Sequence, residues 1–157
     1  MSGVRLMWHL ARRWWGSLST RPPASDDLEW ALAQLLPGER ELWLRMGVAD
    51  RRHSIEVARR FVRVADDPTR DQIAGALLHD VGKIESGLST TLRVVATLVG
   101  PRTDRFRRYH HHEALGLALA EAAGSSADTL ELLRWRGPAV NALRLADDYD
   151  RASRPSG

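Results

Sequence analysis

The sequence contains no cysteine, and Lys83 is the single lysine among 23 basic residues. Without cysteine the chain forms no disulfide, has no thiolate nucleophile and cannot bind zinc or an iron–sulfur cluster through sulfur. Any metal must therefore bind to histidine and carboxylate ligands. The other 22 cations are arginines, a pattern that a GC-rich coding bias would produce, so Lys83 stands out as an exception.

The composition also excludes several classes of protein. Apolar residues make up 43% and charged residues 27% of 157 residues, which is typical of one soluble globular domain with short extensions. The net charge is only +3, and the arginine pairs are scattered and often lie next to acidic residues. A nucleic-acid surface usually concentrates its cations, so we expect no nucleic-acid binding.

Residues 1–25 are predicted to form an N-terminal amphipathic helix followed by a Pro-rich linker. Apolar residues of VRLMWHLARRWWGSL recur at helical spacing, and STRPPAS then breaks the helix. The helix is too short, and too interrupted by arginine, to span a membrane, and it lacks the pattern of a signal peptide. It could lie on an anionic membrane surface, dock on its own domain or form a homodimer. We therefore expect a cytoplasmic protein with a possible peripheral membrane contact.

Residues 26–152 are predicted to form one all-α domain, with a disordered tail over 153–157. No stretch alternates with period two, whereas helical periodicity recurs along the chain. Trp30, Trp43 and Met46 are expected in the core. The predicted helices cover about 26–36, 39–46, 50–64, a segment opening at Thr69 or Asp71, and about 90–99, 103–123, 126–135 and 138–152.

The segment ALLHDVGKI, residues 76–84, places three polar side chains in an apolar helix. On a helix Lys83 lies one turn from His79 and Asp80, so all three should share one face. An unpaired carboxylate and ammonium would be costly there, and a bound cation with its anionic ligand would compensate them. Histidine and aspartate together suit a divalent ion.

The ordered set His53, then His79-Asp80 within HDVGK, then Asp147 within ALRLADD resembles the HD superfamily of metal-dependent phosphohydrolases. The resemblance covers about residues 28–152 and implies an all-α helical bundle, in agreement with the periodicity. It implies a divalent cofactor, Mn, Fe, Ni, Co, Zn or Mg, whose ligands would be His53, His79, Asp80 and Asp147. Asp80 and Lys83 would be catalytic, with Asp80 orienting the nucleophile and Lys83 neutralising charge on the phosphoryl group.

The pattern departs from the two-metal members of this superfamily. Those members carry two further histidines, and the first of them would be His112 or His111 in the run YHHHEALG. The second aligns with Arg136, which cannot bind a cation. One metal is therefore expected rather than two, and Arg136 could instead contact a substrate phosphate or be a solvated surface residue.

Two functions remain open at this point. The resemblance implies a hydrolase of a nucleotide or another small phosphate ester. The alternative is a catalytically inactive HD domain that binds a metal or nucleotide and acts as a regulatory or membrane- or partner-docking module.

Overall fold

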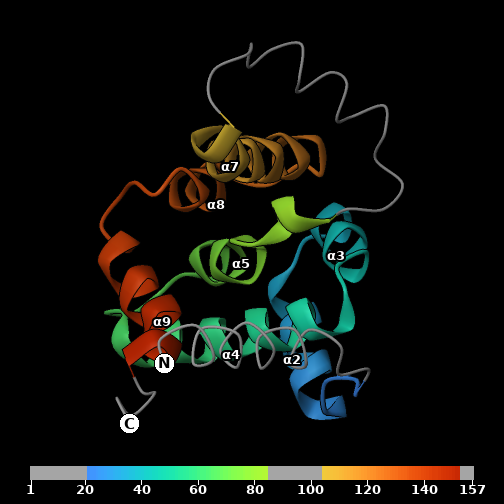
Figure 1. Ribbon diagram of the computed structural model, residues 1–157. Coiled ribbons are helices and arrows are strands. Elements are labelled where there is room, and N and C mark those ends of the chain that lie inside the picture. The colour runs from blue at the N-terminus through green and yellow to red at the C-terminus, as the bar shows by residue number, and fades with distance from the viewer. Residues whose placement is uncertain (1–20, 85–103, 153–157) are drawn as a thin grey trace, which may run out of the picture.

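A computed structural model of the chain describes the backbone of residues 21–84 and 104–152 and the side chains of residues 21–84 and 113–149. Every regular element within these ranges is a helix (Figure 1), so the predicted all-α class is confirmed. The predicted helices over 4–18 and 90–99 and the tail over 153–157 lie outside the described residues. The elements are α2 (Ser25–Gln34), α3 (Pro37–Leu44), α4 (Val48–Val64), α5 (Arg70–Leu78), the 3₁₀ turn η1 (Val81–Lys83), α7 (Asp104–Ala122), α8 (Ala127–Leu133) and α9 (Val140–Ala152).

Helix α5 lies at the centre of the bundle (Figure 1). It packs against α4 and α8 and also contacts α2 and α3. Its residues from Ala74 to Leu78 are all buried, as expected for a helical segment that is apolar on every side. Because α5 is enclosed in this way, the residues that follow it are held inside the bundle.

The start of α5 is fixed by a reciprocal cap between Thr69 and Gln72. The Gln72 N–H donates to Thr69 Oγ1 at 3.2 Å, and the Thr69 N–H donates to Gln72 Oε1 at 3.1 Å. Such a capping box satisfies two backbone donors that a helix start leaves without partners. It decides between the two predicted openings of this helix, Thr69 and Asp71, in favour of Thr69 as the cap.

The predicted continuous helix through HDVGK is not observed. Helix α5 ends at Leu78, and Asp80 has φ −103° and ψ 9°, outside the α-helical range. A 3₁₀ turn follows, in which the Lys83 N–H donates to the Asp80 carbonyl at 3.0 Å. Lys83 and Asp80 still share one side of the chain, because residues three apart lie one above the other in a 3₁₀ turn.

Helix α7 covers this turn at close range. An added Cβ at Gly116 would lie 3.1 Å from the Gly82 nitrogen and 3.4 Å from Val81 Cγ1. Since that spacing leaves no room for a side chain at Gly116 without movement of the neighbouring backbone, the α7–η1 contact depends on glycine. The contact holds η1, and with it Lys83, against the bundle.

Helix α4 is anchored at its first turns by a buried hydrogen bond. The Trp43 Nε1–H donates to Ser54 Oγ at 2.9 Å, and both residues are 0% exposed. Trp43 and Met46 are core residues as predicted, whereas Trp30 is only partly buried and packs against the core from outside. None of the described helices is both long and apolar enough to cross a lipid bilayer.

Candidate metal centre

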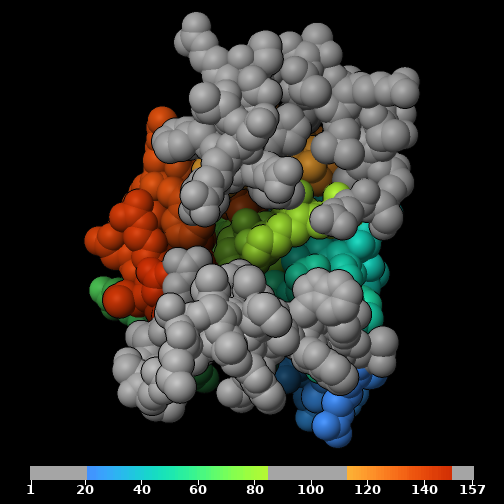
Figure 2. Space-filling model, in the orientation of Figure 1, coloured from blue at the N-terminus to red at the C-terminus, as the bar shows by residue number. Residues whose placement is uncertain are grey.

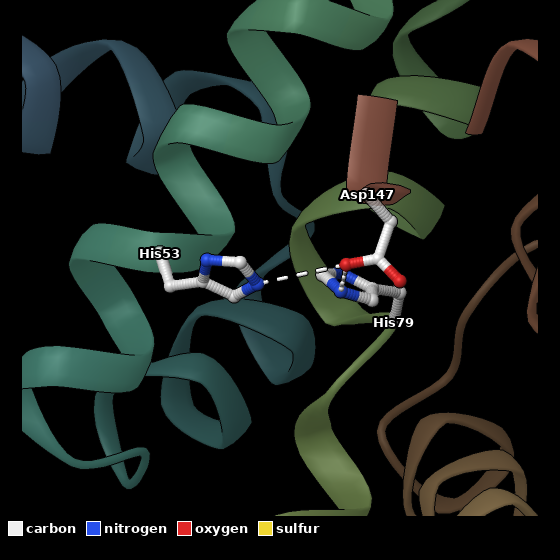
Figure 3. Close-up of side chains that lie close together, drawn as sticks. All are labelled: His53, His79 and Asp147. Atoms are coloured by element: carbon white, nitrogen blue, oxygen red, sulfur yellow. Dashed lines mark ion pairs between the residues drawn. The ribbon is translucent and has the colours of Figure 1, made fainter. Parts of the chain in front are cut away.

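The four predicted ligand residues converge from three segments of the bundle. His53 lies on α4, His79 and Asp80 follow the end of α5, and Asp147 lies on α9. Figure 3 shows the His53 and His79 rings turned toward the Asp147 carboxylate. Residues separated by 94 positions in the sequence are thus neighbours, because α4 packs against both α5 and α9.

The distances between the donor atoms are short and similar. Asp147 Oδ1 lies 3.5 Å from His79 Nε2 and 3.6 Å from His53 Nε2. Asp80 Oδ2 lies 3.6 Å from His79 Nε2 and 4.0 Å from His53 Nε2. Each imidazole therefore faces both carboxylates.

The backbone fixes which nitrogen of His79 faces the site. His79 Nδ1 lies 2.8 Å from the Ala76 carbonyl oxygen, which can only accept a hydrogen bond, so Nδ1 carries the proton. Nε2 is buried and has no hydrogen-bond partner among the described residues. A metal-ligating histidine commonly donates its other ring N–H to a carbonyl in this way, which leaves the lone pair on the ligating nitrogen.

His53, His79 and Asp147 form a donor set that could hold one divalent ion, and Asp80 lies beside them. At metal–ligand distances of about 2.1 Å, two ligand atoms of one ion lie at most about 4.2 Å apart. All four imidazole–carboxylate separations, from 3.5 to 4.0 Å, are inside this limit. One donor atom from each of His53, His79 and Asp147 can be chosen so that all three lie within 4.8 Å of one another. Any pair of these atoms that lies wider than about 4.2 Å apart would have to close before one ion could bind all three residues.

The charges of the site are strongly coupled. Burial would lower the pKa of His79, but the carboxylates of Asp147 and Asp80 outweigh it and raise that pKa above its ordinary value of 6.5. The facing imidazoles of His53 and His79 hold the pKa of Asp147 far below its usual range. Such a cluster attracts a positive charge, which either protons or a metal cation can supply.

Asp80 differs from Asp147 because it also binds the only lysine. Lys83 Nζ donates to Asp80 Oδ2 at 2.6 Å. Burial would raise the pKa of Asp80, but His79 and then Lys83 lower it, so the carboxylate is ionised at neutral pH. The predicted grouping of His79, Asp80 and Lys83 is therefore present, although a 3₁₀ turn rather than an α-helix produces it.

The site is open to solvent on one side. The His79 side chain is only 3% exposed, whereas the side chains of His53 and Lys83 are 34% and 53% exposed. In the view of Figure 2, atoms of α5 and η1 reach the surface between those of α9 and those of α3 and α4. A small molecule could therefore approach from the side of His53 and Lys83.

The residues predicted for a second metal are not brought into this cluster by any described contact. The side chains of His111 and His112, on α7, lie outside the described residues, so their role stays a prediction. Arg136 is exposed in the turn between α8 and α9, where its N–H donates to the Glu131 carbonyl at 3.1 Å. Among the described residues, no ion pair joins its guanidinium to Asp80 or Asp147.

Comparison with known proteins agrees with this geometry. The model of the HD domain family, a metal-dependent phosphohydrolase-type domain, matches residues 51–152, more than half of the chain. The protein belongs to the HD domain family. HD domains generally bind divalent metals, and the matched region contains all four predicted ligand residues. No curated protein and no solved structure shows significant similarity to the chain.

Proposed function

We propose that this protein is a metal-dependent hydrolase of a small phosphate ester, with a nucleotide as the favoured substrate class. The observation that carries the proposal is the buried Nε2 of His79, which has no hydrogen-bond partner among the described residues and faces two carboxylates. A lone pair on Nε2 that points at two anions is unfavourable unless a proton or a metal cation lies between them.

His53, His79, Asp80 and Asp147 would hold the ion. When bound, the ion would polarise a phosphoryl oxygen and lower the pKa of a water molecule. His79 contributes a fixed tautomer through its bond to the Ala76 carbonyl. The two carboxylates contribute two negative charges, which balance the charge of a divalent ion.

Asp80 and Lys83 would act on the substrate side. Asp80 orients the attacking water, because its carboxylate is ionised and lies beside the ligand histidines. The Lys83 ammonium donates to Asp80, and 53% of the Lys83 side chain is exposed to solvent. It can therefore donate to a phosphoryl oxygen and offset the charge that develops there.

The proposal is tested by hydrolysis assays on metal-reconstituted protein. A panel of chromogenic phosphomonoesters, phosphodiesters and nucleotides should reveal turnover that chelation abolishes. Asp80→Asn should remove this turnover while leaving the fold intact by circular dichroism. Asp128→Asn, an exposed carboxylate on α8, is the matched control and should retain it. Absence of turnover on the whole panel by protein shown to contain metal would contradict the proposal.

A second candidate function rests on Arg136. Where two-metal relatives are expected to carry a ligand histidine, this chain has an exposed arginine. An HD domain that binds a metal and a nucleotide without hydrolysing it would satisfy the same geometry. Calorimetric titration with nucleotides separates the two functions, because the binding module would bind and release them unchanged.

A further inference from the structure

The proposed site depends on how α4 and α9 pack, because each helix supplies one of its ligands. His53 lies on α4 and Asp147 on α9, and 3.6 Å separates their facing atoms. A shift of one helix relative to the other by one ångström would change that distance directly. A residue that joins the two helices beside the ligands would therefore determine the geometry of the site.

Arg60 is placed to do this. It lies seven residues after His53, which is two helical turns, so both side chains project from the same face of α4. Arg60 Nη1 donates to the carbonyl oxygen of Ala146 at 2.9 Å. Ala146 immediately precedes Asp147, so the hydrogen bond holds the peptide unit that carries the ligand.

The surroundings of Arg60 hold its guanidinium in this position. The side chain is only 13% exposed, and Cζ lies 5.3 Å from the centroid of the Tyr149 ring on α9. On its other side, Nη2 lies 3.4 Å from Glu56 Oε2. A largely buried guanidinium loses hydration, and the contacts with Ala146, Tyr149 and Glu56 compensate for that loss.

The hydrogen bond from Arg60 to the Ala146 carbonyl is additional to the hydrogen bonds within α9. Ala146 lies six residues before the end of α9, so its carbonyl oxygen belongs to the repeating hydrogen bonds of the helix. The bond from Arg60 is an additional one that crosses between helices. Its effect is to fix the position of α9 along α4.

We propose that Arg60 is a positioning residue that sets the distance between His53 and Asp147 and thereby the affinity of the site for a divalent ion. The proposal rests on the metal site inferred above. Arg60 acts through the backbone of α9 and does not itself bind the ion.

The neighbouring Arg59 provides a matched control. It lies on the same helix, with Nη2 3.0 Å from Asp27 Oδ1 and Cζ 3.8 Å from the centroid of the Trp30 ring. Both of these partners belong to α2 and not to α9. Arg59→Ala therefore removes the same charge and a similar set of contacts without touching the helix that carries Asp147.

The sign of the effect separates positioning from electrostatics. Removal of a nearby positive charge should by itself strengthen the binding of a cation. Loss of a residue that orients metal ligands typically weakens metal binding by about 10- to 100-fold. Arg60→Ala should therefore weaken the site even though it removes a repulsive charge.

The experiment is a titration of the metal-free full-length protein with Co²⁺, followed by its visible absorption, which reports ligand geometry. Arg60→Ala should lower the Co²⁺ affinity by about 10- to 100-fold and alter the spectrum, whereas Arg59→Ala should match the wild type in both. Arg60→Lys, which retains one donor for Ala146, should recover part of the affinity. Chemical denaturation of each metal-free variant gives its stability separately.

The outcomes distinguish this inference from the proposed function. If the wild type binds no Co²⁺, both fail. If the wild type binds Co²⁺ and Arg60→Ala binds it equally well with the same spectrum, or Arg59→Ala weakens binding as much, the positioning role is refuted and the metal site stands. If Arg60→Ala does not fold, Arg60→Lys decides: reduced affinity supports the role, and unchanged affinity overturns it.

Discussion

The buried bond between Trp43 and Ser54 gives a quantitative prediction for the helix that carries His53. Ser54→Ala would leave the Trp43 Nε1–H without its acceptor inside a side chain that is 0% exposed. A buried donor without a partner costs about 1–3 kcal/mol. Since a domain of this size typically has about 5–15 kcal/mol of stability, the variant should remain folded and measurably weaker.

A double-mutant cycle isolates the free-energy cost of leaving the Trp43 Nε1–H without an acceptor. Ser54 Oγ also donates to the Arg51 carbonyl at 2.9 Å. Ser54→Ala removes that bond both in the wild type and in a Trp43→Phe variant, so its cost cancels in the comparison. In a Trp43→Phe background there is no indole N–H to leave unpaired, so Ser54→Ala should cost at least about 1 kcal/mol less than in the wild type. Urea unfolding of the metal-free proteins, followed by circular dichroism, measures both costs. Equal costs in the two backgrounds would refute the reasoning.

Three further predictions concern the site. A divalent ion at 100 times its Kd should stabilise the protein by about 2.7 kcal/mol, or about 5–11 °C in Tm. That gain should grow with pH, because the ion binds only the deprotonated ring of His79. The raised pKa of His79 stabilises the metal-free protein below pH 6.5, and this contribution is lost as pH rises through the folded-state pKa. Thermal melts between pH 6 and 8 measure the gain, and a gain independent of pH would contradict this. Lys83→Met should lower kcat/KM by about tenfold or more while leaving metal content unchanged, and Lys83→Arg should not fully restore it, as steady-state kinetics would show. Gly116→Val should destabilise the protein by about 1–3 kcal/mol in urea unfolding, because Cβ would lie 3.1 Å from the Gly82 nitrogen, whereas Ala122→Val on the exposed side of α7 should cost much less.

The helical class and the central cluster could be predicted from the sequence because both depend on local pattern. Apolar periodicity of 3.6 residues predicted α4 and α9 to within two residues of their observed bounds. The polar groups of HDVGK could be recognised because they interrupt an apolar segment. Their joint placement with His53 and Asp147 came from the resemblance to a known family, since no local rule brings α4, α5 and α9 together.

The end of α5 could not be predicted in the same way. Residues 76–84 remain compatible with a helix, and nothing in their spacing marks Leu78 as its last residue. The 3₁₀ turn that follows packs against α7, where Gly116 approaches Gly82. That contact is tertiary, and it determines a local conformation that propensity leaves open.

Arg60 was missed for a different reason. In a chain with 22 arginines, its position seven residues after His53 could have been noticed but would not have been distinctive. Its contacts with α9, which are the hydrogen bond to the Ala146 carbonyl and the Tyr149 ring, separate it from Arg59. The fixed tautomer of His79 likewise depends on the Ala76 backbone carbonyl, and the amino-acid sequence does not indicate where that carbonyl points.

The central claim is that His53, His79, Asp80 and Asp147 bind a divalent ion, and metal content tests it most directly. Protein purified without chelator and without oxygen should contain about one equivalent per chain by elemental analysis, as expected for a single site. His79→Gln, which removes the buried Nε2 ligand, should contain far less and should not be reloaded by dialysis against Mn²⁺, Fe²⁺ or Zn²⁺. A wild-type protein that contains no metal even after reconstitution, or a His79→Gln protein with full metal content, would contradict the account.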